Sequence, residues 1–136
     1  MTMATFHLQI VTPDRLVYDG EARQIILRTV GGDAAILAGH IDYSAPLGIG
    51  EAKLTDAEGK VRSAACQGGL LTVSGGQVWV MATTFEWADE IDVNRANSGA
   101  ERARAAIQKK ESEREYEVAQ VKLKKALNRI RIAGDK

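Results

Sequence analysis

The segment EIDVNRANSGAERARAAIQKKESEREYEVAQVKLKKALNRIRI, residues 90–132, contains no proline and a single glycine. Its abundant alanine, glutamate, lysine and arginine residues all favour helix. Apolar residues recur in it at spacings of three and four, which is the period of one face of a helix. The first stripe is Val93, Ala96, Ala100, Ala103 and Ile107, and the second is Tyr116, Ala119, Leu123, Ala126 and Ile130. The segment therefore predicts two helices, each with one narrow apolar face.

Polar residues indicate where each helix begins. Asp92 stands where an N-cap side chain would accept a hydrogen bond from the first free backbone N–H groups. Ser112 and Glu115 have the spacing of a capping box. Because the first stripe is mostly alanine, the helices could pack closely as an antiparallel hairpin. The junction at residues 109–112 contains neither glycine nor proline, so the sequence also allows the two helices to join into one continuous helical rod. Residues 89–136 are therefore a candidate conformational switch.

The preceding part of the chain is typical of β-structure. Eleven of the 13 glycines and both prolines lie at or before Gly76. Residues 5–11, TFHLQIV, alternate apolar and polar side chains with the period of a half-buried strand. Further strands are expected in residues 21–29, 34–37, 48–55 and 60–66, and Gly75 and Gly76 predict a tight hairpin turn within residues 70–82. Such closely spaced turns favour a sandwich or a barrel over parallel units.

Composition excludes several classes of protein. Basic and acidic residues balance at 18 each, so the chain as a whole has no attraction for nucleic acid or an anionic membrane. A lone Cys66 excludes an internal disulfide, and the first residues lack the apolar core of a signal peptide. No apolar run approaches the roughly 20 residues needed to cross a bilayer. We therefore expect a reducing, cytosol-facing location without direct membrane insertion.

No pattern of catalytic or metal-binding residues is present. His7 and His40 lie on different expected elements and lack companions at metal-ligand spacing. Cys66 has no adjacent catalytic partner, so a buried strand residue is the simplest interpretation. The glycines of residues 67–77 lack the lysine and the following hydroxyl residue of a phosphate loop, and they are interpreted as turn residues. We predict no catalytic residue and no metal site, and hence no enzyme.

Two charged features remain. Asp92, Arg95 and Arg102 place a carboxylate near two guanidinium groups, which suits either an anion site or ordinary ion pairs on a helix surface. Residues 121–136 contain six basic residues against one acidic residue: Lys122, Lys124, Lys125, Arg129, Arg131 and Lys136 against Asp135. A solvated helix face would explain this excess, but it also suggests an acidic partner. Nucleic acid is the weakest candidate, because the rest of the chain offers no basic surface.

Four motifs in order carry a family resemblance. Residues 6–22, FHLQIVTPDRLVYDGEA, and residues 36–47, ILAGHIDYSAPL, are similar to the opening strand and the Ile-Leu-x-x-His segment of the epsilon subunit of F-type rotary ATP synthases. Residues 68–82, GGLLTVSGGQVWVMA, resemble that family's last hairpin. Most specifically, residues 90–103, EIDVNRANSGAERA, resemble its Ile-Asp-x-x-Arg-Ala signature and the following Glu-Arg-Ala. The chain resembles bacterial members of this family over essentially its whole length.

The resemblance implies a fold that is α+β by segments. An N-terminal antiparallel β-sandwich, residues 1–88, would dock on the gamma stalk and the membrane ring. A C-terminal antiparallel two-helix hairpin, residues 89–136, would be regulatory. The implied function is that of a non-catalytic central-stalk subunit of the proton-translocating ATP synthase, which couples rotation to ATP synthesis and inhibits ATP hydrolysis through movable helices. A free-standing nucleotide-sensing module is the alternative, and H+ or Na+ coupling is left open by this chain.

The resemblance also implies partners and site residues. The partners would be the gamma subunit, the c-ring and the catalytic alpha/beta head, at the cytoplasmic face of the cell membrane. No cofactor is required, but regulatory ATP is implied at Glu86, Asp92, Arg95, Ala96, Arg102 and Arg129. The basic tip, defined as Lys122, Lys125, Arg129 and Arg131, would carry the inhibition, and His40, Ile41 and Asp42 would dock on the stalk or ring. Two features depart from the family: Lys125 replaces an arginine, so we expect weaker ATP binding, and Ser98 and Gly99 interrupt the first helix.

Overall fold

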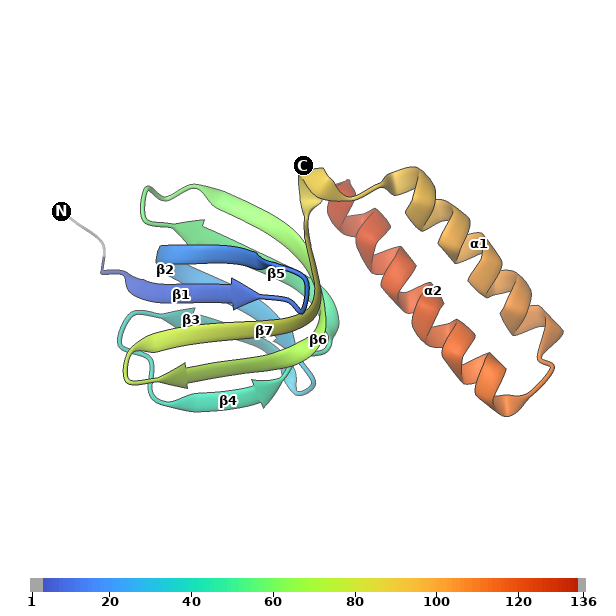
Figure 1. Cartoon of the computed structure of the whole chain (residues 1–136), viewed down its shortest axis with the longest axis horizontal. Coiled ribbons are helices and arrows are strands. Elements are labelled where there is room, and N and C mark those ends of the chain that lie inside the picture. The colour runs from blue at the N-terminus through green and yellow to red at the C-terminus, as the bar shows by residue number, and fades with distance from the viewer. Residues whose placement is uncertain (1–3, 135–136) are drawn as a thin grey trace. The chain divides into compact units, whose positions relative to one another are not determined.

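The computed structural model describes residues 4–134 and divides into two compact units, Met1–Trp87 and Ala88–Lys136. The first unit contains seven strands (Figure 1). These are β1 (Phe6–Val11), β2 (Leu16–Thr29), β3 (Gly32–Leu37), β4 (Tyr43–Pro46), β5 (Ile49–Asp56), β6 (Val61–Ser74) and β7 (Gln77–Trp87). The second unit contains a short 3-10 helix, η1 (Ala88–Glu90), and the helices α1 (Val93–Lys109) and α2 (Glu113–Ala133).

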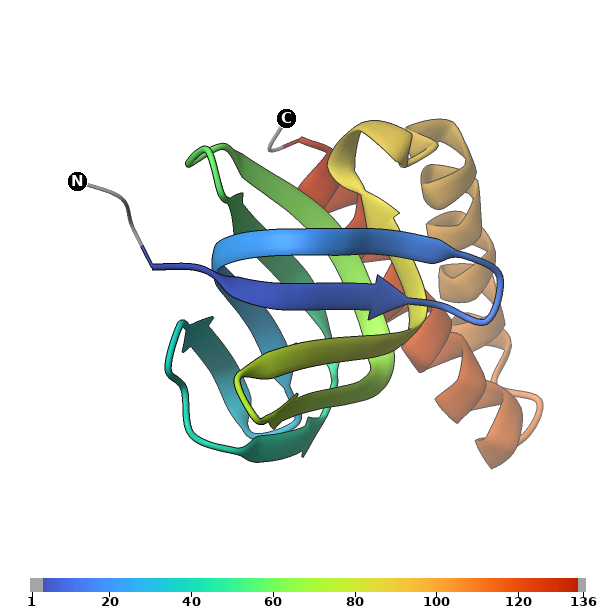
Figure 2. The same ribbon diagram turned by 60° about the vertical axis from the view of Figure 1, so that its left-hand side comes forward.

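The strands form the expected β-sandwich, because the long strands change partners along their length. The first half of β2 pairs with β1, and its second half pairs with β3 and β5. Similarly, β6 pairs with β5 through residues 61–67 and with β4 through residues 70–73. Figure 2 shows β1 and β2 crossing the front of the resulting sandwich. The pairing is antiparallel throughout, except that β1 and β7 run parallel, which the sequence did not predict.

Alternation along the strands builds one apolar core. In β1 the side chains of Phe6, Leu8 and Ile10 are buried, whereas His7 is exposed. The same alternation in the other strands completes the core, whose members all lie between Phe6 and Trp87. Burying each large aliphatic side chain stabilises a fold by about 1.5–3 kcal/mol. The hydrophobic core of the first unit is therefore formed by its own residues, without a contribution from the helices.

Two turns of the first unit are held by local groups, and the second of them was predicted from the sequence. The Thr12 hydroxyl accepts hydrogen bonds from the backbone N–H groups of Asp14 and Arg15 between β1 and β2. Gly75 and Gly76, with φ of 58° and 79°, form the tight turn between β6 and β7, as the paired positive φ values of such hairpins require.

Three strand predictions were wrong in detail. The strand expected at residues 21–29 begins at Leu16. Residues 43–46 form β4 rather than part of a loop, and Gly68 and Gly69 lie inside β6 rather than in a turn. These two glycines stand where β6 changes its partner from β5 to β4, and both have positive φ. A β-carbon built on Gly69 would lie 2.0 Å from the Met81 carbonyl oxygen on β7. The glycines therefore permit a bend with close backbone approach, which local turn chemistry does not distinguish from a loop.

In the second unit α1 and α2 form the antiparallel hairpin shown in Figure 1, one of the two arrangements that the sequence left open. The Asp92 carboxylate accepts a hydrogen bond from the Arg95 backbone N–H at 3.0 Å. The Ser112 hydroxyl accepts one from the Glu115 N–H at 3.1 Å, which is the serine half of the expected capping box. Both predicted helix starts are thus confirmed.

The seam between the helices is as thin as the stripes predicted. The alanines of both stripes are buried: Ala96, Ala100, Ala103, Ala119 and Ala126. The larger stripe members Ile107, Tyr116, Leu123 and Ile130 are only half-buried. A seam of small side chains removes little apolar surface from water, so the hairpin itself gains little stability from packing.

The turn of the hairpin depends on a residue in an unfavourable conformation. Lys110 ends α1 with φ 42° and ψ 53°, in the left-handed region that glycine normally occupies at this position. A non-glycine residue there costs roughly 1–2 kcal/mol. The Lys110 ammonium lies 3.8 Å from the Glu113 carboxylate and 5.1 Å from the centre of the Tyr116 ring. Those exposed contacts offset only part of that cost.

Candidate functional site

Two arginines on α1 are available for an anion. Arg95 and Arg102 are seven residues apart, so they project from the same side of the helix. The structure records no ion pair for either guanidinium within residues 4–134. The Asp92 carboxylate accepts the Arg95 backbone N–H as a helix cap. The choice between an anion site and ordinary ion pairs on the helix surface stays a prediction.

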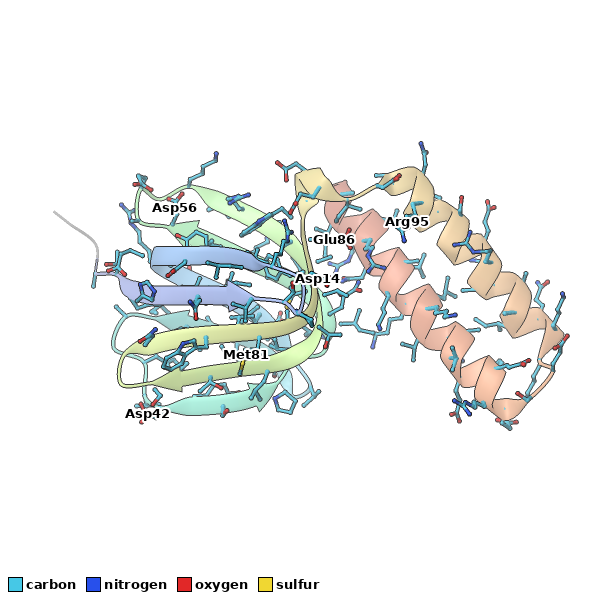
Figure 3. The ribbon with its side chains drawn as sticks, in the orientation of Figure 1. Asp14, Asp42, Asp56, Met81, Glu86 and Arg95 are labelled. Carbon is cyan, nitrogen blue, oxygen red and sulfur yellow. The ribbon has the colours of Figure 1, made fainter. Side chains whose placement is uncertain are left out.

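Gly99 lies between the two arginines on that side of the helix. A β-carbon built on Gly99 would be 3.9 Å from Nη2 of Arg102, so this guanidinium folds back along α1 in the direction of Arg95. Arg95 is labelled in Figure 3. Two guanidinium groups on one side of a helix can grip a polyphosphate through several N–H donors. Because Gly99 has no side chain, it leaves space beside them.

The other residues of the predicted ATP site have different positions. Ala96 is buried in the helix seam, and Arg129 and Lys125 are half-buried on α2. Glu86 belongs to the first unit, where it is half-buried on β7 and labelled in Figure 3. Asp92, Arg95, Ala96, Arg102 and Arg129 thus share the helical unit. Their role in binding ATP stays a prediction.

The basic tip divides into two parts on α2. Lys122, Lys125 and Arg129 follow spacings of three and four and share one face of the helix. Arg131 lies about 160° around the helix from Arg129, and its Nη2 atom donates a hydrogen bond to Asn128 Oδ1 at 2.8 Å. Sequence composition grouped the four residues, whereas the helix separates Arg131 from the rest. Lys136, the other end of the charged run, lies outside the described residues.

The predicted docking loop is held to a neighbouring turn of the sandwich. Asp42, labelled in Figure 3, accepts a hydrogen bond from the Gly75 backbone N–H at 3.1 Å. His40 Nδ1 lies 2.7 Å from the Ile41 carbonyl oxygen, and the centre of its ring lies 5.8 Å from that of Tyr43, with the two rings tilted by 59°. These contacts order the loop and leave the Ile41 side chain 78% exposed. The loop is therefore presented to solvent, but its role in docking stays a prediction.

The environment of the one cysteine and the grouping of possible metal ligands bear on the reactions that the chain could carry out. Cys66 is buried in the core, and desolvation raises the pKa of its thiol to about 12. A thiol with such a pKa has almost no thiolate at neutral pH and is a poor nucleophile. Within residues 4–134, histidine, cysteine and carboxylate side chains form no group that could hold a metal ion. Across the same residues, no helix has both the length and the apolar character needed to span a bilayer.

Sequence reasoning missed a set of exposed apolar residues on the sandwich. Leu70, Met81 and Leu16 are each more than a third exposed, and they come from three different strands. Cross-strand pairing aligns them with Pro46 and Val11. Each residue alone is an ordinary exposed side chain. Only the strand register, which the sequence does not show, could have identified the set.

Comparisons with known proteins agree with this two-part organisation. The family model described as ATP synthase, Delta/Epsilon chain, beta-sandwich domain matches residues 5–88, and the long alpha-helix domain of the same chain matches residues 89–134. The ATP synthase epsilon chain of Ruminococcus albus is 38% identical over 135 residues, covering 98% of this chain and 100% of the relative. That of Bacillus velezensis is 38% identical over 133 residues, with the same coverage. The sodium ion specific epsilon chain of Propionigenium modestum is 37% identical, covering 96% of this chain and 95% of its own length.

Solved structures share the fold at lower identity. A chain of the Euglena gracilis mitochondrial ATP synthase structure, titled OSCP/F1/c-ring in rotational state 1, superposes with a TM-score of 0.82 at 23% identity, covering 94% of this chain and 81% of that one. A chain of the Tetrahymena thermophila structure, titled central stalk/cring, gives 0.62 at 12% identity, covering 98% and 99%. With its full-length relatives and both domain matches, the chain belongs to the epsilon-chain family of the ATP synthases, whose members are subunits of that complex and not enzymes in themselves.

Proposed function

We propose that this chain is a central-stalk subunit that couples rotation to ATP synthesis and restrains ATP hydrolysis through its C-terminal helices. Its partners would be the gamma subunit, the c-ring and the catalytic alpha/beta head, and it would lie at the cytoplasmic face of the cell membrane. Membership of the epsilon-chain family supports this role. The observation that carries it is that the chain consists of a sandwich with its own core, followed in the sequence by a weakly packed helical hairpin.

The helical unit has the properties of a two-state element. Its seam buries mainly alanine, and its turn holds Lys110 in a left-handed conformation. If Lys110 returned to helical angles, α1 and α2 could join into the rod that the sequence also allows, and the left-handed strain would be released. A partner that binds one of the two forms better would shift the balance between them. We assign the inhibitory contact to the basic tip, and we expect its partner surface to be acidic.

The coupling ion is selected by other subunits, and we propose H+ on the basis of the implied family function. Overall similarity does not distinguish the ions, because the sodium ion specific relative is about as similar as the others. An assembled complex whose synthesis responds to Na+ at constant pH would contradict the proposal.

Regulatory ATP binding to the hairpin form is the second part of the proposal. Arg95 and Arg102 share one side of α1 and lack ion pairs among the described residues. A ligand that binds only one form stabilises that form by RT ln(1 + [L]/Kd), which is about 1.4 kcal/mol when ATP is near ten times Kd. That energy is comparable to the roughly 1–2 kcal/mol cost of the left-handed Lys110. Even weak binding could therefore set the balance at millimolar ATP.

We expect titration calorimetry of the purified chain to show saturable ATP binding, and Arg95→Ala and Arg102→Ala each to weaken it by about tenfold or more. A hydrogen bond to a charged group contributes about 1.5–3 kcal/mol, which corresponds to that factor. Arg104→Ala is the matched control, because Arg104 is also an exposed arginine of α1 but projects about 160–180° away from the other two.

Lys125 provides a test in the opposite direction. Lys125→Arg introduces a planar fork that can bind phosphate with two parallel hydrogen bonds, so we expect tighter ATP binding. A wild-type chain without saturable binding at millimolar ATP would contradict the regulatory site. Equal weakening of ATP binding by Arg95→Ala, Arg102→Ala and Arg104→Ala would also contradict it, because that result would indicate only an effect of net positive charge.

Copurification tests the proposal as a whole. A tagged copy of the chain, expressed in the organism that produces it, should copurify with the gamma subunit and the catalytic alpha/beta head in fixed proportion. The first unit should be sufficient for recovery, because its core is complete without the helices. A chain that binds ATP but is recovered alone would instead fit the free-standing nucleotide sensor.

A further inference from the structure

The last residues of β7 are packed into the core of the first unit. Trp87 ends the strand and is only 5% exposed, and Phe85, two residues earlier, is 4% exposed. Their rings meet edge to face, with the ring centres 5.0 Å apart and the ring planes at 83°. The end of a strand commonly frays, because its final residues have few buried contacts. The end of β7 instead belongs to the hydrophobic core.

Arg62 on β6 covers the ring of Trp87. Strand pairing places Ala64 opposite Trp87, and Arg62 lies two residues before Ala64 on the same face of β6. Because β7 ends at Trp87, no residue of β7 stands opposite Arg62. The guanidinium carbon of Arg62 lies 3.7 Å from the centre of the Trp87 ring. At this distance the cation is attracted by the negative face of the indole.

The Arg62 cation is paired with this ring rather than with a carboxylate. Among residues 4–134 the structure records no ion pair for Arg62. A second arginine holds the same end of β7, because Arg15 Nη2 donates a hydrogen bond to the Phe85 carbonyl oxygen at 3.3 Å. Arg15 lies in the turn between β1 and β2, so the two arginines come from separate parts of the sandwich. We call Arg62 and Trp87 the clamp.

The clamp stands immediately before the helical unit in the chain. The two units divide between Trp87 and Ala88. Ala88 is buried and begins η1, which contacts α2 within the second unit. Figure 1 shows β7 leading directly into η1. The last residue held by the sandwich and the first residue of the helical unit are therefore adjacent, and the connection between the units has no spare residue.

We propose that Arg62 is a positioning residue for the inhibitory helices: by holding Trp87 it fixes the point at which the helical unit is attached and keeps the connection short. The inference rests on the proposed function, in which these helices act on the catalytic head. A short connection keeps the helices at a high effective concentration near their target, and a longer connection lowers it. Release of residues 85–87 would add up to about 10 Å of chain, because an extended residue spans about 3.3–3.6 Å. The helices would then block a smaller share of the complexes.

The first measurement is hydrogen exchange of the backbone amides of residues 84–88 in the full-length chain. Arg62→Met keeps a long side chain over the ring but removes the charge, and we expect it to speed this exchange about fivefold. Arg62→Lys keeps a cation and should stay within about twofold of wild type. Arg23→Met is the matched control, because Arg23 is also a half-buried arginine of the first unit, but its Nε atom donates to the Ala57 carbonyl oxygen in the turn after β5. Thermal unfolding of each variant verifies that it is folded.

The second measurement is ATP hydrolysis by complexes rebuilt with each variant. Arg62→Met should raise hydrolysis about two- to threefold, which is less than complete loss of the helices gives, while the amount of bound chain stays the same. Trp87→Leu removes the ring but keeps an apolar side chain, and we expect the same increase. Combining Trp87→Leu with Arg62→Met should add little, because both substitutions remove one and the same contact.

Three results would overturn the positioning role of Arg62. Equal effects of Arg23→Met and Arg62→Met on exchange, or equally faster exchange at residues 78–82 in the middle of β7, would show a general loosening of the sandwich. Faster exchange at residues 84–88 with unchanged hydrolysis would show that the clamp holds the strand end without positioning the helices. If removal of residues 89–136 raises hydrolysis and Arg62→Met does not, the proposed function stands and this inference is wrong. If neither change raises hydrolysis, the proposed function fails and the inference fails with it.

Discussion

Removal of residues 89–136 is expected to raise ATP hydrolysis by the assembled complex about tenfold while the shortened chain remains bound. If helices α1 and α2 hold nine-tenths of the complexes in a blocked form, their loss returns all of them to the active form. The shortened chain should still fold, because every member of the sandwich core lies at or before Trp87. The measurement is steady-state hydrolysis by complexes rebuilt with full-length or shortened chain.

Charge substitutions identify the part of the helices that is responsible. The triple substitution Lys122→Ala/Lys125→Ala/Arg129→Ala removes the three basic residues that share one face of α2. It should give most of the increase in ATP hydrolysis that removal of the helices gives. Arg131→Ala is the control, because Arg131 projects elsewhere and hydrogen-bonds Asn128. Raised salt should act in the same direction as the triple substitution, since exposed charge pairs are screened.

Three results would contradict this account. Unchanged hydrolysis after removal of the helices would exclude them as inhibitors in this complex. Loss of the shortened chain from the complex would show that docking needs the helical unit. Equal effects of Arg131→Ala and the triple substitution would indicate that total positive charge, rather than one helix face, determines inhibition.

Gly69→Ala is expected to destabilise the sandwich by roughly 3 kcal/mol or more, with a decrease of about 12 °C or more in the unfolding midpoint. Gly69 has a φ of 115°, which other residues rarely adopt, and this strain alone costs about 1–3 kcal/mol. The added β-carbon would also meet the Met81 carbonyl oxygen at 2.0 Å and the Ala82 α-carbon at 2.8 Å. Both are backbone atoms of β7, so relief requires β6 and β7 to separate.

Gly32→Ala separates the cost of the positive φ from the cost of the clash between the added β-carbon and the neighbouring strand. Gly32 has a similar φ of 123°, but a β-carbon there would have no heavy atom within 4 Å. We expect it to show only the backbone cost of about 1–3 kcal/mol. Thermal and urea unfolding of both full-length variants provide the comparison. Equal losses of stability would show that the close approach of β6 and β7 relaxes without cost.

The helices were predictable from sequence because their determinants are local. The spacing of Ala96, Ala100 and Ala103 and the caps at Asp92 and Ser112 involve groups within a few residues of one another. The same local signals located β1 and the Gly75–Gly76 turn. They did not identify β4 or place Gly69 inside a strand, because both features depend on β6 changing its partner from β5 to β4. Pairing between distant segments leaves no periodic signal in either segment.

The sequence alone determined the two-part organisation, the helix starts and the family, because each is encoded in short motifs or in periods of two and about four residues. Tertiary structure decided which side chains are neighbours. It separated Arg131 from the rest of the basic tip and left Arg95 and Arg102 without ion pairs among the described residues. It also aligned Val11, Leu16, Pro46, Leu70 and Met81 across five strands. Those five residues come from three separate parts of the chain, the β1–β2 hairpin, β4 and the β6–β7 hairpin, so only the hydrogen-bonded register of the sheet, which is set by the buried faces of its strands, could form one surface from them.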